Sequence, residues 1–348
     1  MAARRAERTP VVSTPSSPSA ERIWPESNCY VDLWVGVLRD LSLEPEAMLA
    51  CTAAPRFEGD QWTFCKPTAT ELAELYGLRV EELTIWRSLR EHVAVQLGLG
   101  RLVLVEVDAF HLPDTVGVSY RTAHQKTTIG IVGLDEAQRR LDYYHNAGRY
   151  QLSGDELDAV LSSRVLGADL PPFAELVDAS RAAARRGDLL RERSRMVAAR
   201  RLAGAEKSNP FSAWAARAAY ETERLRAHDL EFFHAWAFAS MRQAGSMAEQ
   251  LATWCDWVDG SAGIVAAAEA LRTIARTLKT QQFRLARLAR GGSADLAPTL
   301  ERCAKEWAAA QEAIAHLCAS HERIQGVALP DGGSPMGRSR ERSLSALS

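Results

Sequence analysis

The sequence lacks most of the features that assign a chain at once to a class of protein. Six cysteines in 348 residues are too few for a disulfide-stapled fold, and no two of them form a C-x-x-C pair. The formal net charge of −2 gives no general electrostatic attraction for nucleic acid. No apolar run approaches the roughly 20 residues that a membrane-spanning helix needs. We therefore expect a cytoplasmic protein with no metal or cofactor of its own, no membrane contact and no nucleic-acid partner.

The two ends of the chain differ in composition from the rest. Residues 1–20 begin with basic residues but contain no apolar core of the kind that a secretory signal requires. They are rich in proline, serine and threonine, and residues 326–348 have the same character. We predict disordered tails at both ends, a mixed helix-and-strand domain over 21–161, and a helical domain over 162–325.

The domain over 21–161 carries both helix and strand patterns. Runs of β-branched and apolar residues predict strands over 101–110, 126–135 and 139–146, and a fourth strand starting near residue 148. Apolar residues at helical spacing predict helices over 29–41, 45–52, 70–76 and 89–97. Helices first and strands later are typical of an α+β domain, here with an antiparallel sheet.

From Gly154 onward alanine, leucine, arginine and glutamate dominate, and strand patterns disappear. Breaks in the helical spacing at 208–210, 259–260 and 291–293 predict a bundle of about five or six helices. Residues 181–201 are rich in arginine, which fits an exposed helix face with Glu–Arg pairs or a surface that docks an acidic partner. No Pro/Gly/Ser linker separates the halves, so we expect one interdependent unit.

Cys29 lies at the predicted start of a helix. Ser27 and Asn28 before it are favourable N-cap residues, and apolar residues follow at helical spacing. Unpaired backbone N–H groups and the positive end of the helix dipole stabilise a thiolate at such a place. Packing as a small buried apolar residue is the alternative.

A thiol nucleophile needs a base, and the base needs an orienting group. His124 precedes the strand over 126–135, while His145 and Asn146 close the next strand. Because antiparallel neighbours joined by a short turn bring these ends together, we expect His124 and Asn146 to be adjacent. The resulting order is a cysteine on a helix, followed by a histidine and an asparagine on adjoining strands.

That order is papain-like, and the segment from Arg22 to about Leu161 resembles the N-terminal domain of the butirosin-biosynthesis acyltransferase family. The resemblance rests on five segments in this order: NCYVDLWVGVL, FEGDQWTF, GRLVLVEVDAFHLPD, HQKTTIGIVGLD and YYHN. It implies a papain-like fold and the transfer of an acyl group from a carrier-protein thioester to an amine. The whole chain resembles still more a bacterial family of unassigned function with a helical C-terminal half.

The resemblance implies that Cys29 is the nucleophile and His124 the base, and we prefer Asn146 as the orienting group. It also implies an acyl donor held on the phosphopantetheine arm of an acyl carrier protein. The acceptor would be a small-molecule amine or hydroxyl. His145 and Asp108 are the alternative orienting groups, since these acyltransferases tend to use an aspartate as the third member.

Papain-like peptidases place a glutamine six residues before the cysteine to stabilise the oxyanion, but this chain has Ile23 there. Asn28 and Gln61 are the candidates for that role, and His111 is a candidate residue of the same cleft. Two other functions stay open, a papain-like hydrolase (peptidase or amidase) with water as acceptor, and a non-catalytic binding protein on the same scaffold.

Overall fold

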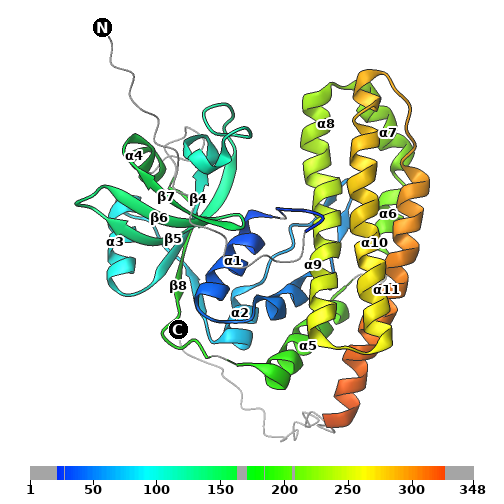
Figure 1. The fold of residues 1–348 in the computed structure, drawn as a ribbon, viewed down its shortest axis with the longest axis horizontal. Coiled ribbons are helices and arrows are strands. Elements are labelled where there is room, and N and C mark those ends of the chain that lie inside the picture. Colours follow the sequence, from blue (N-terminus) through cyan, green and yellow to red (C-terminus); the bar gives the residue numbers. More distant parts are fainter. Residues whose placement is uncertain (1–21, 27, 163–170, 184, 206–207, 326–348) are drawn as a thin grey trace, which may run out of the picture.

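The computed structural model describes residues 22–26, 28–162, 171–183, 185–205 and 208–325. The tails predicted for 1–20 and 326–348, and the predicted N-cap candidate Ser27, lie outside these ranges. Within them the chain forms a six-stranded antiparallel sheet and, beside it, a group of long helices from the C-terminal half (Figure 1). The α+β class and the helical C-terminal half are therefore confirmed.

The sheet has the strand order β3-β8-β4-β5-β6-β7, and every neighbouring pair is antiparallel. Its strands are β3 (Arg79–Glu82), β4 (Leu102–Asp108), β5 (Lys126–Asp135), β6 (Arg140–His145), β7 (Gly148–Ser153) and β8 (Ala174–Asp178). A separate hairpin consists of β1 (Phe57–Glu58) and β2 (Gln61–Trp62). Strands β4 to β7 match the four predicted strands, because each is an apolar, β-branched run bounded by turn residues.

Strand β8 corrects the prediction that the chain has no strand after Gly154 and that 162–325 is wholly helical. It lies inside the sheet, between β3 and β4. The strand is only five residues long and carries two carboxylates, which weakens its apolar pattern. Both carboxylates are satisfied by residues distant in sequence, since Glu175 accepts from the Tyr30 hydroxyl and Asp178 from Arg79. A local pattern does not reveal such partners.

Helical segments of the N-terminal half are α1 (Cys29–Asp40), the 3₁₀ segment η1 (Pro45–Thr52), α2 (Ala69–Tyr76), α3 (Leu89–Gly98) and α4 (Asp155–Leu161). The first four agree with the predicted ranges to within about two residues. Clear N-caps set three of the starts. Asn28 caps α1, and Thr68 and Ser88 form capping boxes at α2 and α3.

Helix α1 approaches the sheet at very short range. A Cβ atom at Gly130 of β5 would lie 3.3 Å from Leu33 of α1, and one at Gly36 of α1 would lie 3.1 Å from the Tyr144 ring of β6. These separations are tighter than ordinary van der Waals contact between carbon atoms. One glycine on each side of the interface therefore permits the contact.

The same helix runs across the strands rather than along them. Near its N-terminal end the Tyr30 hydroxyl donates to Glu175 of β8 at 2.9 Å. At its C-terminal end Asp40 accepts from the Tyr144 hydroxyl of β6. Since β8 and β6 lie on opposite sides of β4 and β5, α1 spans the middle of the sheet.

The C-terminal half contains α5 (Gly187–Ala203), α6 (Pro210–Ala215), α7 (Ala218–Ala227), α8 (Leu230–Ala237), the π-helical segment η4 (Phe238–Arg242), α9 (Gln243–Val258), α10 (Ala262–Leu285), the 3₁₀ segment η5 (Leu288–Arg290) and α11 (Ala297–Gln325). Helices α8 and α9 form one long rod through η4 (Figure 1). The three predicted breaks fall between α5 and α6, between α9 and α10, and between α10 and α11.

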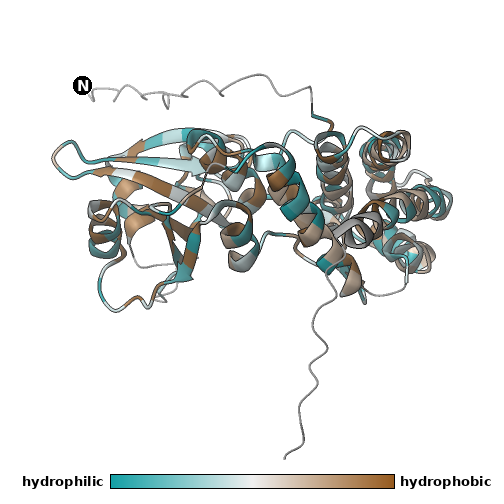
Figure 2. Cartoon of the chain, turned by 90° about the horizontal axis from the view of Figure 1, so that it is seen from below, coloured by the Kyte–Doolittle hydropathy of each residue, from teal (hydrophilic) through white to brown (hydrophobic). Residues whose placement is uncertain are grey.

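The sheet separates two hydrophobic cores. Side chains alternate along a strand, so Leu104 of β4 lies in one core and Val103 and Val105 lie in the other. The second core fills the space between the sheet and helices α3 and α4. The first core joins α1 and η1 to the C-terminal helices and includes Trp34 and Trp254. In Figure 2 hydrophobic residues, in brown, run along the strands, and the hairpin that projects farthest from the sheet is teal. Packing therefore continues across the domain boundary predicted at residue 161.

The segment before α1 is tied to the C-terminal helices. Trp24 is 2% exposed and donates from its ring N–H to the carbonyl oxygen of Ala275 at 3.2 Å. The backbone N–H groups of Ile23 and Trp24 donate to the two carboxylate oxygens of Glu249 at 2.7 and 2.9 Å. Gly245 of α9 leaves room for the indole, because a Cβ there would lie 2.4 Å from the ring nitrogen. The chain therefore enters α1 from a fixed point on the helical half.

Gly245→Ala should destabilise the protein by about 1–3 kcal/mol, because the added methyl group displaces the buried Trp24 ring. Gly263→Ala in α10 is the matched control, since nothing lies within 4 Å of a Cβ there. Alanine favours a helix over glycine by up to about 1 kcal/mol, so the control should keep or gain stability. Urea unfolding followed by tryptophan fluorescence measures both variants, and equal stabilities would contradict the anchor.

Candidate active site

Asp108 and His124 form a hydrogen-bonded pair where β4 ends and β5 begins. Asp108 Oδ2 lies 2.6 Å from Nδ1 of His124. The other carboxylate oxygen accepts the backbone N–H groups of Phe110 at 3.0 Å and Gln125 at 3.2 Å. Asp108 is paired with Lys126 in the β4–β5 ladder, which places the pair at one end of the sheet. Rigid backbone thus holds the carboxylate, and the carboxylate holds the imidazole.

The two members of the pair differ in exposure. The side chain of Asp108 is 5% exposed and that of His124 is 59% exposed. Burial raises the pKa of Asp108, but the hydrogen bonds from His124 and the two backbone N–H groups outweigh burial, so the pKa is lowered. The His124 ring also stacks on Phe110, with centroids 4.4 Å apart. An ionised carboxylate therefore holds Nδ1, and Nε2 has no hydrogen-bond partner among the described residues.

Cys29 is the first residue of α1, directly after the N-cap. The Asn28 side chain accepts from the backbone N–H of Val31 at 2.8 Å and donates to the carbonyl oxygen of Cys65 at 2.9 Å. This double contact fixes the start of the helix on the segment around Cys65. The structure therefore places the thiol in the first turn, as the sequence predicts.

The other five cysteines are buried, whereas Cys29 is partly exposed. Burial raises the pKa of Cys65 to about 11 and the pKa values of Cys255 and Cys303 to about 12. Burial also raises the pKa of Cys51 well above its ordinary value. These four thiols therefore stay protonated at neutral pH, and Cys29 is the thiol that solvent reaches.

Helix α1 and the loop that carries His124 meet the same sheet at different strands. The hydroxyl of Tyr30, one residue after Cys29, donates to Glu175 of β8, whereas His124 is bonded to Asp108 at the end of β4. Within the described ranges no hydrogen bond joins Cys29 to His124, so the thiol and the imidazole are not in direct contact.

The remaining predicted site residues lie at different places. Asn146 occupies the turn between β6 and β7 with φ of 48°, and no hydrogen bond links it to His124 in the described part of the chain. His111 ends the 3₁₀ segment η2 (Ala109–His111), and Phe110 contacts both His111 and His124 through its ring. Gln61 belongs to the β1–β2 hairpin, which packs on α6. Asp108, an alternative in the sequence, is the residue that orients His124.

His145 belongs to a buried network instead of a cleft. Its Nδ1 lies 2.5 Å from Asp114 Oδ2, and its Nε2 lies 2.8 Å from the Thr127 hydroxyl. Tyr143 donates to the other oxygen of Asp114 at 2.5 Å. A hydroxyl, an imidazole and a carboxylate in this order have the connectivity of a catalytic triad. The side chains of His145 and Asp114 are only 2% and 3% exposed, so a substrate does not reach them.

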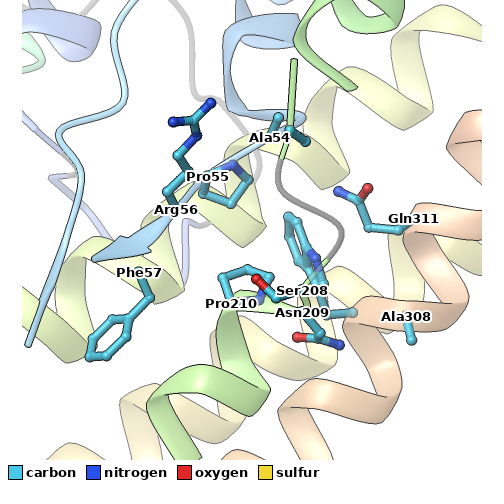
Figure 3. Close-up of a pocket in the computed structure, with 11 residues that line it drawn as sticks. Ala54, Pro55, Arg56, Phe57, Ser208, Asn209, Pro210, Ala308 and Gln311 are labelled. Atoms are coloured by element: carbon cyan, nitrogen blue, oxygen red, sulfur yellow. The ribbon is translucent and has the colours of Figure 1, made fainter. Parts of the chain in front are cut away.

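A cavity of about 220 Å³ lies between the two halves of the chain (Figure 3). Its walls come from the segment after η1, the segment before α6, and α11. The polar side chains in the walls serve structural contacts: Arg56 donates to Gly204, Asn209 to Ala304, and Gln311 to Ala53. None of the predicted catalytic residues lines this cavity.

Four arginines of the arginine-rich stretch 181–201 bind inward. Arg185 and Arg193 both donate to the carbonyl oxygen of Glu74 in the last turn of α2. Two further arginines reach the last turn of α9, Arg191 at the Trp257 carbonyl and Arg195 at the Val258 carbonyl. Carbonyl oxygens at helix C-termini lack intrahelical partners and carry the negative end of the helix dipole. Contacts within the chain therefore account for these four arginines.

In the ranges that the structure describes, no helix is both long and apolar enough to cross a membrane. The same residues contain no group of three or more histidine, cysteine, aspartate or glutamate side chains arranged to hold a metal ion.

Two family models match the chain. The DUF1839 N-terminal domain matches residues 15–179, and the DUF1839 C-terminal domain matches residues 187–316. The first match ends just after β8 and so includes every strand of the sheet. A comparison with curated proteins found no match.

Iodoacetamide should label Cys29 before any other thiol of the folded protein, because the other five are buried. Peptide mass spectrometry after short labelling at neutral pH measures the order. Labelling in urea is the control, since unfolding should make all six thiols react at similar rates. Equal labelling of all six in the folded state would rule out a distinct environment for Cys29.

Asp108 should make stability depend on pH in one direction. Its lowered pKa means that it stabilises the fold above the unfolded value of about 3.9, and this contribution disappears as pH falls through the folded-state pKa. Urea unfolding of wild type and Asp108→Asn between pH 6 and pH 2.5 tests this. The difference in unfolding free energy should be largest near pH 6 and shrink below about pH 4. A constant difference would show that ionised Asp108 contributes nothing.

Proposed function

The chain belongs to the DUF1839 family, and we propose that its N-terminal domain is a cysteine-dependent acyltransferase. It would move an acyl or aminoacyl group from a carrier-protein thioester to an amine or hydroxyl. The observation that carries the proposal is the Asp108–His124 pair, an imidazole oriented by a buried carboxylate. Such a pair is what a thiol nucleophile requires. The one partly exposed cysteine of the chain begins α1, a helix that packs across the same sheet.

The first half of the reaction transfers the acyl group to the enzyme. Nε2 of His124 takes the proton from the Cys29 thiol, and the thiolate attacks the thioester carbonyl. The backbone N–H of Cys29, in the first turn of α1, donates to the oxyanion. The donor thiolate leaves with the proton from His124, and acyl-Cys29 remains.

The second half releases the product. The incoming amine or hydroxyl gives its proton to His124 and attacks the acyl-Cys29 carbonyl. The Cys29 sulfur leaves and recovers the proton. Because the two side chains are not in contact without substrate, donor binding has to bring them to about 3–3.5 Å, as catalytic contacts often tighten only in the complex.

The contacts in the structure favour some of the candidate supporting residues over others. Asp108 takes the orienting role in this proposal, because its carboxylate already holds Nδ1 of His124. Asn28 is unsuitable as the second oxyanion donor, since its side chain caps α1 and binds Cys65. Gln61 remains the candidate for that donor. A cysteine-bearing helix packed across an antiparallel sheet, with the histidine on that sheet, supports a papain-like fold.

A thiol-dependent hydrolase is the second candidate function. The 59% exposure of the His124 side chain favours it, because water has direct access to the base. The two functions share the acyl-Cys29 intermediate and differ in how it breaks down. Decay of the adduct in water without an acceptor would favour the hydrolase, and decay that requires an amine would favour the transferase.

Incubation with an acylated carrier protein should add the acyl mass to the wild-type chain, as measured by intact-protein mass spectrometry. Cys29→Ala should abolish the adduct, and His124→Ala should slow its formation by about 10²–10⁴-fold. Asp108→Ala should slow it less, because an orienting group does not carry the proton. Asn146→Ala is the matched control at the end of the neighbouring strand and should have the mildest effect.

The double variant Cys29→Ala with His124→Ala should be no worse than Cys29→Ala alone, since residues that act as a unit are not additive. If His111→Ala loses the adduct while His124→Ala keeps it, the base is His111. If Cys29→Ala retains full turnover, the cysteine mechanism fails and a binding protein becomes the better description.

A further inference from the structure

The loop between β4 and β5 carries both His111 and His124, and a buried carboxylate holds it on a neighbouring strand. That carboxylate belongs to Asp114, in the 3₁₀ segment η3 (Pro113–Thr115). It accepts from the Tyr143 hydroxyl and bonds His145 Nδ1, each at 2.5 Å. Both partners lie on β6, so one side chain fixes the middle of the loop to the sheet.

Every polar group of this network has a partner. Thr127 on β5 completes it through the 2.8 Å contact with His145 Nε2. Burial and the charge of Asp114 raise the pKa of Tyr143, so the phenol keeps the proton that it donates. A fully satisfied buried network is rigid, and the loss of one member leaves the others buried without a partner. The network therefore specifies one position for Asp114.

Thr115, the residue after Asp114, connects this part of the loop to its base through hydrogen bonds. The Thr115 hydroxyl lies within hydrogen-bond distance of two carbonyl oxygens, that of Leu112 at 2.9 Å and that of Ala109 at 3.1 Å. The Thr115 carbonyl accepts the N–H of Ser119 at 3.0 Å. The Ser119 hydroxyl donates to the Gln125 side chain at 2.8 Å. Ala109 and Gln125 are bonded to each other through the backbone and directly follow the two members of the catalytic pair. A shift at Asp114 is thus transmitted to both.

From these contacts we infer that Asp114, His145 and Tyr143 are positioning residues for His124. They act through the loop and do not touch the substrate. The inference rests on the proposed role of His124 as the base. The buried His145–Asp114 pair, which a substrate does not reach, then has a positioning role. The geometry of the exposed His124–Asp108 pair depends on it.

The test compares two variants of the full chain that differ in severity. Tyr143→Phe removes one hydroxyl and keeps the ring, whereas Asp114→Asn removes the charge shared by both partners. Ser194→Ala is the matched control, because Ser194 is equally buried and makes two hydrogen bonds, to the Ala47 carbonyl and from the Trp254 ring, far from the loop in sequence. Urea unfolding identifies conditions in which all the variants are folded.

Two measurements are then made on the folded proteins. Hydrogen exchange with mass spectrometry should show about tenfold faster exchange of peptides over 109–125 in Asp114→Asn, and a smaller increase in Tyr143→Phe. The rate of Cys29 acylation at saturating acylated carrier protein should fall by about 10- to 100-fold in Asp114→Asn. The donor concentration for half-saturation should stay within about twofold, because the network does not contact the donor. Ser194→Ala should change neither the exchange of 109–125 nor the acylation rate.

Unchanged exchange over 109–125 in both variants would overturn the inference, and so would acylation rates equal to that of Ser194→Ala. A parallel fall in donor affinity and rate would also overturn it, since it would mean that the variants disturb the whole domain. If the wild-type chain forms no adduct, the proposed function fails. The exchange measurement then still decides whether the network holds the loop.

Discussion

Helix α1 lies against the sheet at a distance that glycine makes possible. Gly36 faces the Tyr144 ring from the helix side, and Gly130 faces Leu33 from the sheet side. This close contact sets the helix across the strands, with Cys29 at one end and its remaining faces turned toward η1 and the C-terminal helices. Packing in the interior therefore fixes the position of the thiol relative to the strand ends. The helix is rigid, and moving it away from the sheet would disrupt the close-packed core.

The helical half completes that core and is more than an appended module. Its residues share one hydrophobic cluster with α1 and η1, so the core on that face of the sheet is closed only by both halves together. Polar contacts also join the two halves, since arginines of α5 donate to carbonyl oxygens in the last turns of α2 and α9. The arginine side chains neutralise the negative ends of two helices that come from different halves of the chain. The break between the two family domains is thus a boundary in sequence and not in packing.

Local signals account for what the sequence predicts well. An N-cap residue fixes the start of α1, and β-branched runs fix β4 to β7, because each depends on neighbours a few residues away. Other features depend on partners far along the chain. These are strand β8, the contact of Asp108 with His124, and the buried carboxylate of Asp114. Asn146 follows a strand beside β5, but the imidazole of His124 is bonded to Asp108 of β4, and strand order alone does not reveal that choice. The papain-like fold and the acyl-transfer chemistry stay proposals.

The anchor of Trp24 also determines when the native fold can be completed during synthesis. Its indole donates to a carbonyl 251 positions later in the chain, and Lys279 covers the ring at 4.4 Å. During synthesis, which releases the N-terminal part first, Arg22 can pair early with Asp32 of α1, but the Trp24 indole has no carbonyl partner until α10 has left the ribosome. A nascent chain therefore carries α1 for most of translation without the anchor that joins its lead-in segment to the helical half. The native entry into α1 forms only after most of the polypeptide has been made.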